Sequence, residues 1–95
     1  MIAKRTLREF WRRTPAAAEP LKAWYADARA ADWASPDMIR RRHASASSLR
    51  GHRVVFDIGG NKFRLVVPIN YAYRAVYIGF VGTHADYDRI DAETV

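Results

Sequence analysis

Hydrophobic positions in the first third of the chain recur with the spacing of an α-helix. A first set shares one helical face at i, i+3 and i+4: Leu7, Phe10 and Trp11. The stretch TLRE, from Thr6 to Glu9, fits a capping box, in which each side chain bonds the backbone N–H of the other residue. We therefore predict a short helix that ends at Thr14-Pro15, and a short edge strand at 2–3 ahead of it.

Two further helices follow in the predicted order of elements. The second begins at Pro15 or Pro20 and runs to Ala31. Its apolar stripe is predicted to be core: Leu21, Trp24, Tyr25 and Ala28. The third begins at the SPD stretch, 35–37, which supplies an N-cap, a proline and an acidic residue in turn. It ends in the arginines 40–42.

After a polar loop at 43–53, the hydrophobic period changes from about 3.6 to about 2, which is typical of a β-strand. The alternating apolar residues predict one buried face: Val54, Phe56, Ile58, Phe63, Leu65, Val67 and Ile69. Gly59-Gly60-Asn61 predicts a hairpin, and a turn at 70–72 leads to a third strand at 73–81. Helices followed by an antiparallel meander indicate an α+β fold, with the N-terminal helices packed on one face of a small antiparallel sheet.

The opposite face of the predicted sheet carries cations. Arg53, Lys62 and Arg64 alternate with the core positions. Two interpretations stay open from this pattern. The face is either a platform for RNA, whose phosphates bind cations, or the ordinary solvated surface of an antiparallel sheet.

Composition narrows the class of protein. The 95 residues have the length of a single domain, 1–95, and 16 lysines and arginines against 10 carboxylates give a net charge of +6. Such a surface attracts polyanions, nucleic acid among them. The chain has no cysteine, which excludes a disulfide framework and cysteine metal sites, and its histidines lack a familiar metal-ligand spacing. No apolar run reaches the roughly 18 residues of a membrane span, and we expect a cytoplasmic protein without a metal or cofactor.

The stretch GTHADYD, at 82–88, follows the last predicted strand. His84, Tyr87 and Asp88 would share one side of a helical turn at i, i+3 and i+4. A histidine transfers protons near neutral pH, a tyrosine stacks on a base or binds a phosphate oxygen, and an aspartate orients an imidazole. The alternative is a structural histidine beside a turn, because the spacing alone demonstrates no base–nucleophile geometry.

Arg64 is the cation on the most rigid predicted element, the second strand of the hairpin. Cleavage of RNA through its 2′-OH needs a base, an acid for the leaving 5′ oxygen and positive charge at phosphorus. Arg64, together with Lys62 or Arg53, would supply that charge. In the alternative interpretation, Arg64 simply pairs with Asp57 across the hairpin.

The loop histidines and the arginine run also permit two interpretations. His43 and His52 either join His84 as proton-transfer groups or are solvated loop residues. Arg40 and Arg41, within the run at 40–42, contact phosphate or only water.

Several stretches together resemble the HigB toxins of bacterial type II toxin–antitoxin systems, which belong to the RelE-like superfamily. They are IAKRTLREFW, PLKAWY, ADW, RVVFDIGGNKFRLVVPINY and VYIGFVGTHADYDRIDAETV, spread over 2–95, and the part from GNKFRLV through GTHADYD is the most specific. The resemblance implies two main helices packed on a small antiparallel sheet. It also implies an mRNA endoribonuclease, or interferase, that acts at the ribosome, arrests translation and cleaves by metal-independent attack of the 2′-OH.

The resemblance further implies partners and site residues. The partners are a HigA-type antitoxin with a helix-turn-helix, promoter DNA bound through that antitoxin, and mRNA on the ribosome. The sheet arginine of the family matches Arg64 in KFRLVV, the residue after the last core strand matches His84, and the aromatic of the following turn matches Tyr87. Lys62 and Arg53 are the expected phosphate contacts. Two rival hypotheses are a non-catalytic basic RNA- or DNA-binding module and a plain interaction protein with an acidic partner.

Overall fold

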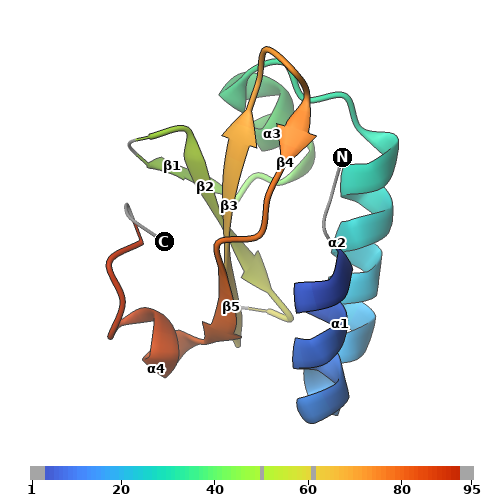
Figure 1. Ribbon diagram of the computed structural model, residues 1–95, viewed down its shortest axis with the longest axis vertical. Coiled ribbons are helices and arrows are strands. Elements are labelled where there is room, and N and C mark those ends of the chain that lie inside the picture. The colour runs from blue at the N-terminus through green and yellow to red at the C-terminus, as the bar shows by residue number, and fades with distance from the viewer. Residues whose placement is uncertain (1–3, 50, 61, 93–95) are drawn as a thin grey trace.

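The computed structural model describes residues 4–49, 51–60 and 62–92, in which a helical half precedes a sheet (Figure 1). The first half contains α1 (Lys4–Arg13), the 3-10 helix η1 (Pro15–Ala17), α2 (Ala18–Ala30) and α3 (Pro36–Arg42). The second half contains β1 (Ser47–Leu49), β2 (Arg53–Ile58), β3 (Phe63–Asn70), β4 (Ala75–Val76), β5 (Phe80–Thr83) and the single-turn helix α4 (His84–Tyr87). The edge strand predicted at 2–3 lies outside the described residues.

The five strands form one antiparallel sheet with β3 at its centre. β2 pairs along one side of β3 and is followed outward by β1, while β4 and β5 pair with successive parts of the other side. α1 and α2 pack together and lie against one face of the sheet (Figure 1). The predicted α+β architecture, with N-terminal helices on one sheet face, is therefore confirmed.

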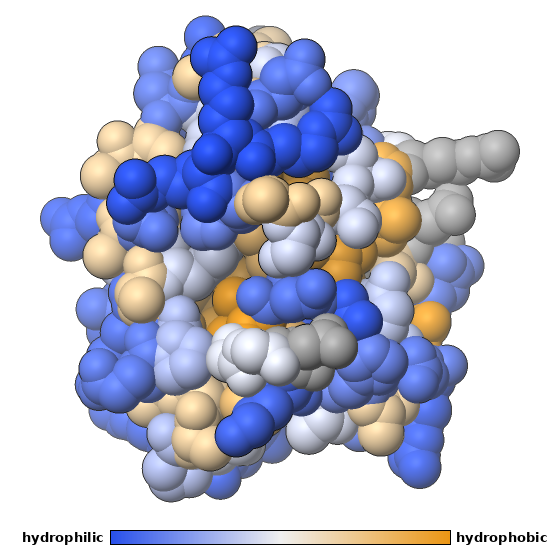
Figure 2. Space-filling model, turned by 180° about the vertical axis from the view of Figure 1, so that it is seen from behind, coloured by the Kyte–Doolittle hydropathy of each residue, from blue (hydrophilic) through white to orange (hydrophobic). Residues whose placement is uncertain are grey.

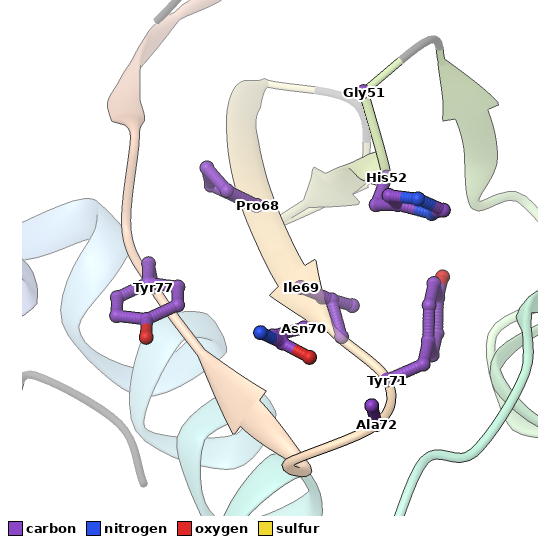
Figure 3. Close-up of a pocket in the computed structure, with 8 residues that line it drawn as sticks. All are labelled: Gly51, His52, Pro68, Ile69, Asn70, Tyr71, Ala72 and Tyr77. Carbon is purple, nitrogen blue, oxygen red and sulfur yellow. The ribbon is translucent and has the colours of Figure 1, made fainter.

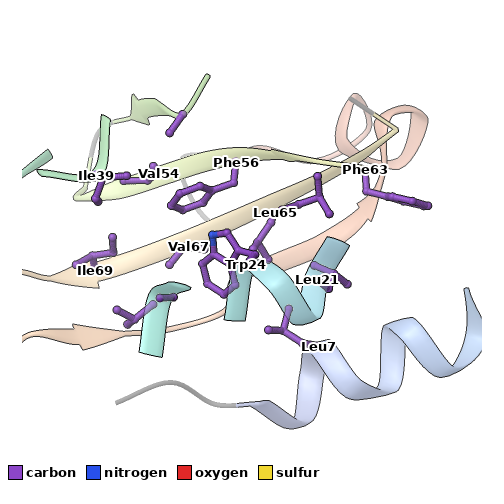
Figure 4. Close-up of a cluster of buried hydrophobic side chains, with 14 of the residues drawn as sticks. Leu7, Leu21, Trp24, Ile39, Val54, Phe56, Phe63, Leu65, Val67 and Ile69 are labelled. Atoms are coloured by element: carbon purple, nitrogen blue, oxygen red, sulfur yellow. The ribbon is translucent and has the colours of Figure 1, made fainter. Parts of the chain in front are cut away.

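The core lies between those helices and that sheet face (Figure 4). Every strand residue predicted on the buried face belongs to it: Val54, Phe56, Ile58, Phe63, Leu65, Val67 and Ile69. The predicted helical stripes supply the opposing layer: Leu7, Phe10, Leu21, Trp24 and Ala28, with Trp11 and Tyr25 packed at its border. Large rings interlock there, since the Trp24 and Phe56 centroids lie 5.3 Å apart in an edge-to-face arrangement, which adds directional attraction to area burial.

Two local predictions are corrected by the structure, and a third is refined. α1 already includes Thr6, so the predicted capping box does not form, and the Glu9 carboxylate instead pairs with Arg5 one turn back at 3.2 Å. Ser35 is the N-cap of α3 as predicted, although its side chain makes no capping hydrogen bond. The predicted loop at 43–53 contains β1, which is short and polar and therefore gives no alternating signal.

The strand predicted at 73–81 is divided by a β-bulge. Ile69 pairs with Val76, whereas Val66 pairs with Phe80, so three steps along β3 face four steps along the other chain. The extra residue shifts the register by one, and side chains beyond it exchange faces. As a result Val81 points into the core, and Phe80 lies on the opposite face of the sheet.

That opposite face is less bare than the sequence predicted. Val55 and Val66, which are register partners across β2 and β3, are only 4% and 0% exposed. Both lie outside the core between helices and sheet, so a second, smaller buried layer exists on this side. The cationic face predicted from the alternation is therefore divided by an apolar strip.

Candidate active site

The strand register orders the face remote from the helices into rows. Residues directly opposite each other on neighbouring strands share a face, and so do residues two apart along a strand. The first row is Asp57, Arg64 and Gly82; the second is Val55, Val66 and Phe80; the third pairs Arg53 with Pro68. Tyr77 extends the third row, because its N–H donates to the Pro68 carbonyl at 2.9 Å. Arg64 thus lies two rows from Arg53.

His84 is positioned by the turn from β5 into α4. Thr83 caps the helix: the Asp86 N–H donates to its hydroxyl oxygen at 3.1 Å, and its own N–H donates to the Asp86 carboxylate at 3.4 Å. The His84 N–H donates to the Lys62 carbonyl at 3.3 Å. Because both ends of this connection are bonded, the imidazole is held beside the first residues of β3.

Arg64 joins three neighbours through different parts of its guanidinium. Nη1 forms an ion pair with Asp57 across the β2–β3 pair, and Nη2 lies 2.8 Å from Nε2 of His84. Its Cζ lies 5.4 Å from the centre of the Tyr87 ring, within the range of a cation–π contact. The three residues predicted as catalytic therefore lie together. The alternative pairing of Arg64 with Asp57 is present as well, so the two interpretations are not exclusive.

The Arg64–His84 contact fixes the tautomer of the imidazole. A guanidinium carries only donors and stays protonated, so Nε2 of His84 must be the acceptor. The ring proton is then on Nδ1, which faces the Asp88 carboxylate at 3.6 Å. In this tautomer the accepting nitrogen is directed at the cation, and Asp88 lies on the other side of the ring, where it could orient the imidazole.

Two aromatic rings border the Arg64 group. The Phe80 and Tyr87 ring centres lie 6.5 Å apart, with their planes at 55°. A Cβ atom at Gly82 would lie 2.6 Å from the Phe80 ring, so only a glycine leaves room for the ring to lie across β5 at this point. The sequence did not predict that Phe80 and Gly82 lie beside Arg64, because their placement depends on the bulge. The available signal was a glycine inside a strand pattern, which often marks a close approach.

The other predicted cations are spread over the molecule. Lys62 is exposed in the turn before β3, next to His84 in space through its carbonyl. Arg53 lies in the third row and donates to the Gly51 carbonyl at 3.4 Å. Arg40 and Arg41 are on α3, at the opposite end of the molecule from α4 (Figure 1). They therefore do not belong to the Arg64 group.

His43 and His52 lie away from His84, so of the two interpretations the structure does not favour the one in which they join it. The His43 ring packs edge-on against Phe56 at 5.2 Å, which places it on the helix-covered face of the sheet. Burial lowers the pKa of His43 and the Arg42 charge lowers it slightly further, while the Asp27 carboxylate opposes both. His52 lies at the far end of β3, where its carbonyl accepts the Ile69 N–H at 2.8 Å.

Within the described residues, no group of three or more histidine, aspartate or glutamate side chains is placed to hold a metal ion. Over the same residues, no helix has the length and apolar character to cross a membrane. The Arg64 group itself offers one cation, one imidazole and a carboxylate behind each of them. This set suits an anionic substrate that loses a proton during the reaction.

Comparison with known proteins gives two matches. The family model of the HigB toxin, described as the RelE-like toxic component of a toxin–antitoxin system, matches residues 17–90. A curated relative, the mRNA interferase HigB of Escherichia coli O6:H1 (strain CFT073), is 26% identical over 92 residues. That alignment covers 95% of this chain and 89% of the relative.

Proposed function

Because this chain belongs to the HigB family of RelE-like toxins, we propose that it is an endoribonuclease that cleaves mRNA and thereby arrests translation. The observation that carries the proposal is the convergence of Arg64, His84 and Tyr87 on one sheet face. The name of the Escherichia coli relative, an mRNA interferase, supports the substrate class. The rival non-catalytic RNA-binding module accounts for the positive charge but gives no reason for an imidazole held against the sheet arginine.

In the proposed reaction, a phosphate oxygen of the RNA replaces His84 as a partner of Arg64. Arg64 Nη2 then donates to the phosphate, which releases Nε2 of His84 to accept the proton of the 2′-OH. The 2′ oxygen bonds to phosphorus as the bond to the 5′ oxygen breaks. The products are a 2′,3′-cyclic phosphate and a 5′-hydroxyl group. The 5′ oxygen takes a proton from solvent, and the imidazolium releases the proton of the 2′-OH to solvent.

The surrounding residues support these two. The Asp88 carboxylate, 3.6 Å from Nδ1, stabilises the imidazolium that forms during the reaction. Asp57 fixes the plane of the Arg64 guanidinium. The positive charge is therefore in place before additional negative charge develops on the phosphate oxygens in the transition state. Tyr87, whose ring lies 5.4 Å from Arg64 Cζ, stacks on a base or orients the phosphate.

The dispersed cations fit a larger RNA surface. Lys62 and Arg53 flank the Arg64 group along the sheet, and we assign them to phosphates next to the scissile one. Arg40 and Arg41 on α3 would bind phosphates further away, as ribosomal RNA would present. The protein would then act on mRNA at the ribosome, in the cytoplasm. A HigA-type helix-turn-helix antitoxin would restrain it and carry it to promoter DNA.

Induction in cells, followed by mapping of transcript 5′ ends, tests the proposal. The parent chain is expected to stop growth and to create new 5′ ends within coding regions, and co-expression of the antitoxin restores growth. Arg64→Ala and His84→Ala should abolish the new ends, whereas Arg8→Ala, an exposed substitution on α1, should not. Bound but intact RNA would favour the binding module. Full activity of either site variant would remove that residue from the mechanism.

A further inference from the structure

A pocket of about 450 Å³ lies at the far end of the sheet face that carries Arg64 (Figure 3). It is formed by the end of β3, the following turn, Tyr77 beyond β4 and the connection between β1 and β2. Its lining residues are Gly51, His52, Pro68, Ile69, Asn70, Tyr71, Ala72 and Tyr77. Resting on the proposed function, we propose that this pocket binds one unpaired base of the RNA substrate, a few nucleotides from the bond that is cut.

The position of the pocket relative to Arg64 supports this assignment. Pro68 lies four residues beyond Arg64 on β3, hence on the same face and about 13 Å away at the usual rise of a strand. The strip between them is the row formed by Val55, Val66 and Phe80. Val55 and Val66 in that row are buried, so an RNA strand with its scissile phosphate at Arg64 would cross the row over the half-buried Phe80 ring and place a nearby base in the pocket.

The walls of the pocket suit a flat aromatic ligand. Tyr77 is 48% exposed and lies beside Asn70 (Figure 3). On the other side, the His52 and Tyr71 rings meet edge-to-face at 5.9 Å. Pockets with aromatic walls and few polar groups are typical ligand sites, and aromatic stacking is the usual way in which proteins hold single-stranded bases.

One amide offers directional recognition within these walls. The Asn70 side-chain oxygen accepts the Tyr73 N–H at 3.2 Å, which assigns the orientation of the amide. The NH₂ group is therefore available to donate to a base edge. Burial raises the pKa of Tyr71, against the opposing effect of Arg40, so its hydroxyl stays protonated and is a second donor. Two donors favour a base edge rich in acceptors.

The pocket is largely preformed. The Ile69 N–H donates to the His52 carbonyl at 2.8 Å, and the Tyr77 N–H donates to the Pro68 carbonyl at 2.9 Å, so both walls are bonded to β3. His52 has a φ of 58°, in the left-handed region that costs energy for a residue with a side chain. A base would therefore meet walls that are already in place, which lowers the entropic cost of binding.

Oligonucleotides that bind but resist cleavage give a direct test. The probes are short RNAs with a 2′-deoxy nucleotide at the cut, each with one abasic nucleotide at a different position. For the parent chain, one abasic position removed from the cut should weaken binding by about tenfold or more, the usual effect of losing a stacked base. Tyr77→Ala should bind every probe equally weakly, without dependence on that position. Equal dependence in parent and variant would overturn the proposal.

Two matched variants sharpen the result. Asn70→Asp keeps an oxygen for the Tyr73 N–H but removes the NH₂ donor, so it should change which base is preferred at that position. Tyr73→Ala removes an 84% exposed ring that does not line the pocket, and should behave as the parent does. If Asn70→Asp keeps the parent's base preference, the amide does not read the base and the proposal fails.

The two proposals fail in different ways. If the parent cleaves RNA but Tyr77→Ala cleaves with the same base preference and keeps the abasic dependence, the pocket is refuted and the ribonuclease proposal stands. If the parent shows the abasic dependence but leaves unmodified RNA intact, the ribonuclease proposal is refuted and the pocket stands. Weaker rescue of Tyr77→Ala by the antitoxin, with the abasic dependence unchanged, would assign the pocket to a protein side chain and overturn the assignment to RNA.

Discussion

Arg64 contacts Asp57, His84 and Tyr87 through separate parts of one planar group. The side chain is 21% exposed, so a charge in this position gains more from its partners than a surface charge would. At the scale of the residue, the ion pair between Arg64 and Asp57 therefore holds the guanidinium in position. Nε2 of His84, the nitrogen that a general base would use, accepts in its contact with Arg64.

Replacing Arg64 by lysine tests whether geometry or charge alone is needed. An ammonium keeps the charge but cannot contact Asp57 and His84 in two fixed directions. We expect Arg64→Ala to lower the single-turnover cleavage rate by about 10²–10³-fold, and Arg64→Lys to recover only part of the loss. Melting temperatures of both variants control for folding. A lysine variant as fast as the parent would show that the planar group is unnecessary.

His43 gives the protein a pH-dependent stability. Its pKa in the folded chain is below the ordinary value of 6.5, chiefly because of burial, so the unfolded chain binds the proton more readily. The folded state is therefore fully favoured above about pH 6.5 and loses stability as the pH falls from there toward the lowered pKa. Thermal melts of the parent and of His43→Phe at pH 7.5 and 5.5 measure this.

The His43→Phe variant should lose less melting temperature on acidification than the parent does. It should also be more stable at neutral pH, because Nε2 of His43 is buried without a hydrogen-bond partner among the described residues. His52→Phe is the matched control, since that residue is exposed and its replacement leaves His43 in place. An identical acid shift in parent and His43→Phe would assign the effect to other groups.

At the scale of the element, much was predictable and one feature was not. The helical stripe through Leu21 and Trp24 and the alternation through Phe56 and Leu65 predict burial directly, because local periodicity determines which face a side chain occupies. The proximity of Arg64 and His84 follows from placing a turn after the last strand. The bulge before Phe80 follows from no local pattern, since register is set by pairing with β3.

Two other features, strand β1 and the burial of His43, were not predicted for related physical reasons. β1 is formed by Ser47–Leu49, whose side chains give no alternation, and it exists because β2 offers an unpaired edge. His43 was predicted at a loop surface, but its ring enters the aromatic cluster with Trp33 and Phe56. In each case the decisive contact comes from a segment distant in sequence, which a single sequence does not display.

Gly82 tests the link between β5 and the site. In Gly82→Ala the new methyl group would overlap the Phe80 ring, so the ring must leave its position beside Tyr87. We expect slower cleavage and a lower melting temperature. Phe80→Ala removes the obstacle, so the double variant Gly82→Ala/Phe80→Ala should be scarcely worse than Phe80→Ala alone. Additive effects in this double-mutant cycle would contradict the proposed overlap.

At the scale of the whole molecule, the fold determines which sheet face is exposed, and the exposed arginines of α3 lie apart from the Arg64 group. The helices occupy one sheet face and leave the other to the Arg64 group and the pocket (Figure 1). Seen from behind, strongly hydrophilic side chains gather at the end that carries α3 (Figure 2). Arg40, Arg41 and Arg42 are exposed there. These arginines are one concentration of positive charge in a chain of net charge +6, and RNA long enough to reach the Arg64 group as well would contact both.

Salt dependence distinguishes these two contributions. The double variant Arg40→Gln/Arg41→Gln should reduce the slope of log affinity against log salt by about 1.4 for single-stranded RNA, since each phosphate contact contributes about 0.7. Cleavage of a short oligonucleotide that reaches only the Arg64 group should be unchanged. Arg8→Gln/Arg12→Gln, on α1, is the control for charge alone. An unaltered slope in the α3 variant would remove those arginines from the RNA surface.

The bulge between β4 and β5 has a consequence for how such chains diverge. The additional residue places Phe80 and Gly82 on the sheet face of Arg64 and Val81 in the core. The number of residues in this segment is therefore constrained more strongly than their identity. Homologues should accept substitutions at the exposed position 79 but retain the number of residues between β4 and β5. A deletion of one codon would turn β5 over and silence the toxin while the helical layer persists.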